Sequence, residues 1–224
     1  MPRSWCVISS RPRLSPSRMM LASPAPASRR VGLLFGSFNP VHVGHLILAE
    51  HFATRSDLAE VWLVVSPQNP FKAAADLLPE AQRLHWVELA VAENPRLRAE
   101  PIELSLPRPS YTIATLDALR ERHPAVEFVL LIGGDNLPGL PRWQHADRLL
   151  AEFDIYVYPR PGTPLPDLAP FPRVQVVQAP LLDISATYIR ESLRRGLSVR
   201  YLVPPAVERE LLTVSLSASD SARK

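Results

Sequence analysis

Short apolar runs alternate with longer amphipathic segments along the chain from Val31 onward. The short runs have the length of strands and are rich in Val, Ile and Leu, whereas the longer segments repeat their apolar residues with the period of a helix. Strands are predicted at Val31–Phe35, Val61–Val65, Leu97–Leu104, Glu127–Ile132, Asp154–Tyr158 and Val174–Val177. Helices are predicted near Val43–Arg55, Pro79–Glu93, Thr112–Arg122, Trp143–Ala151, Ser185–Arg195 and Pro205–Leu212.

This alternation predicts an α/β fold in a single domain over residues 31–213. The strands are rich in Val, Ile and Leu rather than alternating, which is typical of strands with helices on both faces. We therefore expect a doubly wound, mostly parallel sheet with its ligands at the carboxyl ends of the strands. Six prolines between Pro159 and Pro172 predict a surface loop in that stretch, because proline cannot continue a helix or a central strand.

The two ends of the chain lack such a pattern. Residues 1–30 are rich in Ser, Pro and Arg, and we expect a disordered extension or a wrongly assigned start, since Met19 and Met20 offer later starts. An organelle transit peptide, which is also Arg-rich and acid-poor, is the alternative. Residues 214–224 are expected to form a disordered polar tail.

Charge and composition exclude several classes of protein. The formal net charge is +3, but residues 1–30 hold six arginines and no acid, so acidic residues are in excess over the rest of the chain. The charge thus gives no reason to expect nucleic-acid binding. No apolar run approaches the ~18 to 20 residues of a membrane span. A single cysteine, Cys6, excludes an intrachain disulfide and suits a reducing compartment, so we expect a cytoplasmic protein.

The segment Leu34–His45 carries the strongest chemical signal, because it joins the first predicted strand to the first helix. Gly36 allows backbone to approach a ligand closely. His42 and His45 are three residues apart at a helix start, where their rings share a face and where backbone N–H groups attract phosphate. Ligation of a metal by the two histidines is the weaker alternative, because no third ligand is visible nearby.

A second candidate site opens the late helix. Ser185 is a suitable N-cap, and Thr187 follows in the first turn. Arg190 can fold back along the helix, so that two hydroxyls, backbone N–H groups and a guanidinium converge on one polyphosphate.

The pairing of Gly-Ser-Phe-Asn-Pro-x-His-x-Gly-His with Ile-Ser-Ala-Thr-x-Ile-Arg resembles the nucleotidyltransferase superfamily of α/β adenylyltransferases and cytidylyltransferases. Three further segments, Ser66–Lys72, Pro109–Thr112 and Gly133–Trp143, are similar to the bacterial nicotinate-nucleotide adenylyltransferases. The resemblance covers about Val31 to Leu212. It implies a Rossmann-like nucleotidyltransferase fold and the transfer of AMP from ATP to nicotinate mononucleotide, which yields nicotinate adenine dinucleotide and pyrophosphate in NAD biosynthesis.

The resemblance also implies roles for individual residues. His42 and His45 would be catalytic and would contact the ATP phosphates. ATP would be bound by Gly36, Ser37, Phe38, Gly134, Asp135, Arg160, Ser185, Thr187 and Arg190. The mononucleotide would be bound by Asn69, Lys72, Tyr111, Thr112 and Trp143, with the tryptophan stacked on the pyridine ring.

Two residues depart from the common family pattern. Phe35 stands where many relatives have a glycine, and Asn39 replaces their aspartate. Hydrogen bonding survives the second change, but a charge does not, so the role of Asn39 stays open.

The expected mechanism needs no general base, because the attacking phosphate is already an anion. Mg²⁺ is expected to arrive bound to ATP, with no dedicated protein metal site. The expected partners are the two small substrates, without nucleic acid or membrane, and homo-oligomer formation stays open. Alternatives are a phosphopantetheine adenylyltransferase and a nucleotide-sensing module without turnover. A dinucleotide-binding oxidoreductase is disfavoured because Gly-x-Gly-x-x-Gly is absent after the first strand.

Overall fold

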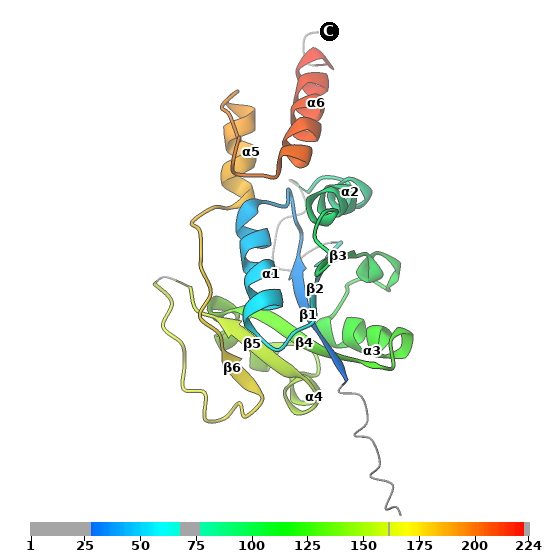
Figure 1. Ribbon diagram of the computed structural model, residues 1–224, viewed down its shortest axis with the longest axis vertical. Helices are drawn as coiled ribbons and strands as arrows, with labels where there is room; N and C mark the ends of the chain where they lie inside the picture. The colour runs from blue at the N-terminus through cyan, green and yellow to red at the C-terminus, as the bar shows by residue number, and fades with distance from the viewer. Residues whose placement is uncertain (1–27, 68–76, 161, 222–224) are drawn as a thin grey trace, which may run out of the picture.

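The computed structural model describes residues 28–67, 77–160 and 162–221, and these form one open sheet with helices on both faces (Figure 1). All the strand pairs of the sheet are parallel, and its order is β3-β2-β1-β4-β5-β6. The strands are β1 (Arg29–Gly36), β2 (Glu60–Val65), β3 (Leu97–Glu100), β4 (Val126–Gly133), β5 (Asp154–Tyr158) and β6 (Val174–Val176). The structure therefore confirms the predicted parallel α/β fold.

The helices divide between the two faces of this sheet. They are α1 (Val43–Arg55), α2 (Glu80–Val91), α3 (Thr112–Arg122), α4 (Ala146–Glu152), α5 (Ala186–Arg194) and α6 (Pro205–Ser221), with 3-10 helices η2 (Ile102–Ser105) and η3 (Gly134–Arg142). Helices α1, α2, α5 and α6 contribute to one hydrophobic cluster, and α3 and α4 contribute to the other. Among the described residues, no helix has the length and hydropathy needed to cross a bilayer.

Successive residues of the central strands pack into opposite clusters. On β1, Leu33 joins the cluster under α3 and α4, while Leu34 joins the cluster under α1. On β4, Leu130 and Leu131 divide in the same way, and each of these side chains is at most 4% exposed. Burial on both faces explains why the central strands are rich in apolar residues rather than alternating.

Strand β3 is shorter than the sequence predicts. It ends at Glu100 instead of Leu104, and η2 follows it. Pro101, between the two, has no N–H group to continue the β-ladder, and its ψ of 7° turns the backbone out of the strand. This break places Glu103, which would have belonged to the strand, on a helical turn.

Helix α4 begins three residues later than predicted. The chain enters it through η3, which contains Pro138 and Pro141, and through His145, whose φ of 52° is left-handed. These residues prevent a continuous helix from starting at Trp143. Helix α6 in turn continues to Ser221, past the predicted end at Leu212 and into residues assigned to the polar tail.

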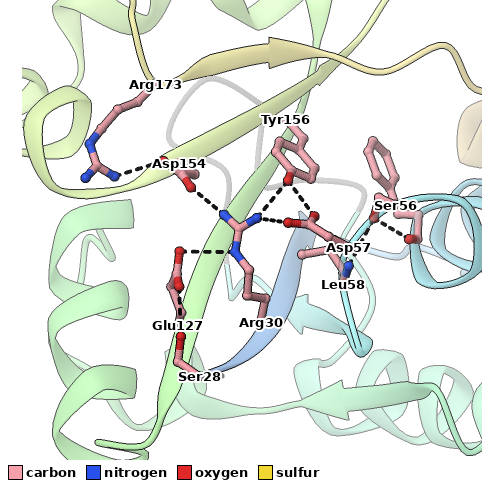
Figure 2. A network of polar contacts seen from close by, with 10 residues as sticks. Ser28, Arg30, Ser56, Asp57, Leu58, Glu127, Asp154, Tyr156 and Arg173 are labelled. Carbon is pink, nitrogen blue, oxygen red and sulfur yellow. Dashed lines mark hydrogen bonds and ion pairs between the residues drawn. The ribbon is translucent and has the colours of Figure 1, made fainter. Parts of the chain in front are cut away.

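The amino ends of the strands are joined by a network around Arg30, which the sequence analysis assigned to the extension (Figure 2). The Arg30 guanidinium pairs with Asp57, Glu127 and Asp154, and it donates a hydrogen bond of 2.9 Å to the Tyr156 hydroxyl. Because β1 begins at Arg29, both Arg29 and Arg30 belong to the folded domain; residues 1–27 lie outside the described residues.

We expect Arg30→Met to lower the free energy of unfolding by about 1–3 kcal/mol, because Asp57, Glu127 and Asp154, whose side chains are 30–53% exposed, all lose the cation that they share. The matched control is Arg29→Met, since Arg29 pairs only with Glu60 in the described structure and is half exposed; its cost should stay within about 1 kcal/mol. Urea unfolding measures both. Equal losses in the two variants would show that the network is not what stabilises this end of the sheet.

Candidate active site

Two cavities adjoin at the carboxyl ends of β1 and β4, where the sheet order reverses direction. The first, of about 580 Å³, is called here the histidine cavity; the second, of about 300 Å³, is called the tryptophan cavity. Gly36 lines the tryptophan cavity and the next residue, Ser37, lines the histidine cavity, while Tyr158 lines both. A ligand in one cavity would therefore meet a ligand in the other at the end of β1.

The turn that separates the cavities is tightly packed. A Cβ at Gly36 would lie 2.9 Å from the ring of Phe38, so only glycine fits. Phe38 has a left-handed φ of 44° and is 1% exposed. Its ring meets His45 edge-on, with 5.0 Å between ring centroids. Phe38 also lines the histidine cavity, so its ring forms part of the wall beside His45.

The two histidines lie together at the start of α1, as the sequence predicts. His42 is the N-cap residue, and its ring stacks on that of His45 with 3.6 Å between centroids. The His42 backbone N–H donates a hydrogen bond of 3.2 Å to Nδ1 of His45. A neutral His45 ring must then carry its proton on Nε2, which makes that atom a hydrogen-bond donor.

His42 is a buried ring, and one of its two nitrogens has no hydrogen-bond partner among the described residues. It is 7% exposed, and its Nδ1 makes no hydrogen bond among the described residues, although the side chain faces the backbone N–H of His45. Burial, together with the nearby charge of Arg160, lowers the pKa of His42 to about 4. The ring is therefore neutral at pH 7, and an anion entering the histidine cavity would supply the missing partner.

The second motif contacts the first through Arg190. Its guanidinium donates a 2.9 Å hydrogen bond to the backbone carbonyl of Asn39 and approaches the Thr187 hydroxyl at 3.4 Å. Ser185 caps α5 by accepting a 3.1 Å hydrogen bond from the Tyr188 N–H group, and it lines the histidine cavity. Thr187 and Arg190 lie beside that cavity rather than in its wall.

The side chain of Asn39 accepts a hydrogen bond from within the protein. Its Oδ1 accepts a 3.2 Å hydrogen bond from the backbone N–H of Leu78, and the residue is 2% exposed. This contact needs an acceptor oxygen but no charge, so an asparagine satisfies it.

Gly134 and Asp135 follow β4 directly. Asp135 forms an ion pair of 3.2 Å with Arg160, which lines the histidine cavity. A Cβ at Gly133 would lie 2.3 Å from Oδ1 of Asp135 and 2.9 Å from Nε of Arg160, so the pair occupies the space that a side chain would take. Arg160 thus brings a positive charge close to His42.

The tryptophan cavity contains three of the predicted mononucleotide residues, Tyr111, Thr112 and Trp143. Tyr111 is the N-cap residue of α3 and gives the helix no side-chain cap, so the first turn is open to an anion. Trp143 follows η3 and packs in part on the core, which leaves the rest of its ring for a ligand. Asn69 and Lys72 lie outside the described residues.

Glu103 is a cavity residue that the sequence analysis did not identify. It lines the tryptophan cavity and is only 3% exposed. Burial raises the pKa of its carboxyl, although hydrogen bonds from the hydroxyls of Thr115, Ser66 and Ser110 oppose that rise. The available signal was an acid between two apolar residues, Ile102 and Leu104.

The chain is similar to a known protein family and to named proteins over most of its length. Residues 33–192 match the family model described as cytidylyltransferase-like. A Cytophaga hutchinsonii protein named "Probable nicotinate-nucleotide adenylyltransferase" is 49% identical over 184 residues, which is 82% of this chain and 96% of that protein. A Bacteroides fragilis protein of the same name is 44% identical over 197 residues, 87% of this chain and 98% of its own length.

The fold is also found among solved structures. Nicotinic acid mononucleotide adenylyltransferase of Plasmodium falciparum, complexed with NaAD, is similar with a TM-score of 0.70. The similarity covers 84% of this chain and 97% of that one at 17% sequence identity. At this identity the likeness shows the fold alone.

We expect inorganic tripolyphosphate to raise the pKa of His42 above its value of about 4 in the free protein, because a nearby anion favours the charged ring. Titration of the histidine ring signals by NMR, with and without tripolyphosphate, measures the change. His51, farther along α1, serves as the internal control and should not respond. An unchanged His42 titration in the presence of bound tripolyphosphate would place the anion elsewhere.

Proposed function

Because this chain belongs to the cytidylyltransferase-like family, and within it to the nicotinate-nucleotide adenylyltransferases, we propose that its two adjoining cavities hold the two substrates of that enzyme. The enzyme transfers AMP from ATP to nicotinate mononucleotide and releases pyrophosphate, a step of NAD biosynthesis. ATP occupies the histidine cavity, and the mononucleotide occupies the tryptophan cavity. The observation that carries this division is the shared wall at Gly36, Ser37 and Tyr158.

The reaction joins two ligands that would meet at this wall. A phosphate oxygen of the mononucleotide attacks the α-phosphorus of ATP, and the bond from that phosphorus to the bridging oxygen of the β-phosphate breaks. The attacking group is already an anion, so the protein need not remove a proton. Catalysis then rests on holding the two phosphates in line and on stabilising charge in the transition state.

The histidines act on the ATP phosphates. His45 donates from Nε2 to the α-phosphate, which is supported by the hydrogen bond that occupies its Nδ1. His42 contributes its buried ring and the atom that lacks a partner in the free protein. The turn Gly36–Phe38 keeps the backbone close to the phosphates, because no side chain fits at Gly36.

The remaining ATP contacts come from two other elements. Ser185, Thr187 and Arg190, at the start of α5, bind the β- and γ-phosphates; the bond from Arg190 to the first motif supports this, since it brings α5 to the histidine turn. Gly134 and Asp135 hold the adenosine, and Arg160 adds positive charge beside the phosphates. Mg²⁺ accompanies ATP and neutralises part of the triphosphate charge when it is bound. In the described part of the chain, no group of three His, Cys, Asp or Glu residues is placed to hold a metal by itself.

The pyridine ring stacks on Trp143 in the tryptophan cavity, with Tyr111 and Thr112 beside it. The open first turn of α3 offers backbone N–H groups to the nicotinate carboxylate. By resemblance to the family, Asn69 and Lys72, which lie outside the described residues, are also assigned to the mononucleotide.

Replacement of His45 by Ala should lower kcat by about 10²-fold or more, because a donor to the transition-state charge is lost. Helical content and melting temperature should change little. His51→Ala on the same helix is the matched control and should keep full turnover. Steady-state rates with circular dichroism spectra decide the outcome; full activity of His45→Ala would remove this histidine from the mechanism.

Product formation from ATP with nicotinate mononucleotide or nicotinamide mononucleotide, measured in parallel, should favour the acid by about 10²-fold or more in kcat/KM. N–H donors aimed at a carboxylate are poorly matched by an amide NH₂ group. Trp143→Ala should raise the KM of the mononucleotide far more than that of ATP and keep the preference for the acid, because stacking tolerates both rings.

Trp143→Phe, which keeps an aromatic face, is the control and should restore most of the lost affinity. If the enzyme used nicotinamide mononucleotide equally well or better, nicotinate mononucleotide would not be its preferred substrate. An unchanged mononucleotide KM in Trp143→Ala would make the residue part of the core.

A further inference from the structure

Arg83 is a charged residue of α2 with no exposed surface. It lies on the same face of the helix as Trp86 and Val87, which are also fully buried in the core under α1 and α2. An arginine at such a position must satisfy its guanidinium inside the protein, because burial of an unpaired charge is strongly unfavourable.

The Arg83 guanidinium donates all four of its described hydrogen bonds to backbone carbonyl oxygens. Nη1 donates to Ser37 at 2.6 Å and to Ser66 at 2.8 Å. Nη2 donates to Pro67 at 2.8 Å, and Nε donates to Leu78 at 3.0 Å. The planar fork of the guanidinium fixes the directions of these bonds, so it also fixes the positions of the carbonyl groups relative to one another.

The carbonyls that share Nη1 come from different walls of the active site. Ser37 belongs to the turn after β1 and lines the histidine cavity. Ser66 follows β2 and lines the tryptophan cavity. One nitrogen atom thus joins the turn that faces the ATP phosphates to the strand end that faces the mononucleotide.

Ser66 also forms a hydrogen bond with a second buried residue, Glu103. The Ser66 hydroxyl bonds to the Glu103 carboxyl, which also accepts a 2.7 Å hydrogen bond from the Thr115 hydroxyl of α3. The guanidinium of Arg83 and the carboxyl of Glu103, both buried, therefore both bond to Ser66 at the end of β2. The position of Ser66 depends on both groups, and the start of α3 is tied to the same set of bonds.

The neighbouring contacts give Arg83 a second connection to the same turn. Leu78, whose carbonyl accepts from Nε, donates its own N–H to Oδ1 of Asn39. The Asn39 carbonyl in turn accepts from Arg190 of the second motif. The loop before α2, the turn after β1 and helix α5 are thus linked through backbone groups adjacent to Arg83.

We propose that Arg83 is a positioning residue that sets the spacing between the two substrate cavities by holding the carbonyls of Ser37 and Ser66 on one guanidinium. It touches neither substrate. In-line transfer depends on the distance between the attacking phosphate and the α-phosphorus, so a displacement of either wall lowers the rate of the reaction. This inference rests on the proposed function of the two cavities.

The test compares Arg83→Met and Arg83→Lys with the wild-type enzyme, by steady-state kinetics on protein shown to be folded. Arg83→Met should lower kcat about tenfold or more per folded molecule and raise the KM of both substrates, because both walls shift. Arg83→Lys keeps the charge but not the fork, and it should recover part of each parameter. Arg96→Met is the matched control, since Arg96 also donates to a buried backbone carbonyl, that of Ala53, away from the site; both of its KM values should be those of the wild type.

A purely structural role would reduce the folded fraction while kcat per folded molecule and both KM values stay unchanged, and that result would overturn the proposal. If Arg83→Met does not fold, Arg83→Lys decides, and wild-type KM values for both substrates in that variant would also overturn it. A wild-type enzyme without turnover would count against the proposed function alone. In that case the dissociation constant of ATP, measured by calorimetry for wild type and Arg83→Lys, still tests Arg83, and equal constants would reject it.

Discussion

The site depends on one feature of the sheet: β1 and β4 lie side by side, yet the chain leaves their carboxyl ends toward opposite faces. Helix α1 follows β1 onto one face, and η3 and α4 follow β4 onto the other. No helix can cover the point where the two connections diverge, so this point stays open to ligands. Both cavities lie there, and the motifs after these strands form their walls.

Stability and chemistry are divided between the two ends of the strands. At the amino ends, Arg30 joins carboxylates from a loop, from β4 and from β5 (Figure 2). At the carboxyl ends, Arg83 and Arg190 donate to backbone carbonyls instead, and Nδ1 of His42 has no hydrogen-bond partner among the described residues. An unpaired buried donor or acceptor destabilises the free protein, and a bound anion would compensate for it.

The predicted elements that were correct are those specified by local sequence. Helix α1 and helix α3 have the predicted bounds, because an apolar helical period and clear flanking residues coincide there. The errors at β3 and α4 involve prolines and a left-handed His145, which override the apolar pattern. The likeness of the two phosphate motifs to a known family indicated the histidines and Ser185, and the structure brings these residues to one cavity.

The sequence by itself determined the alternation of strands and helices that predicts a parallel sheet, the order of the motifs, and the residue types that face a phosphate. Each of these is read from residues within a few positions of one another. The tertiary structure alone decided which distant groups share a bond. Arg83 bonds to Ser37 and Ser66, and Glu103 bonds to Thr115. These partners are too far apart in the sequence for a local residue pattern to predict the bonds. A buried charge is placed by where its partners converge in space, and that convergence exists only once the sheet has formed.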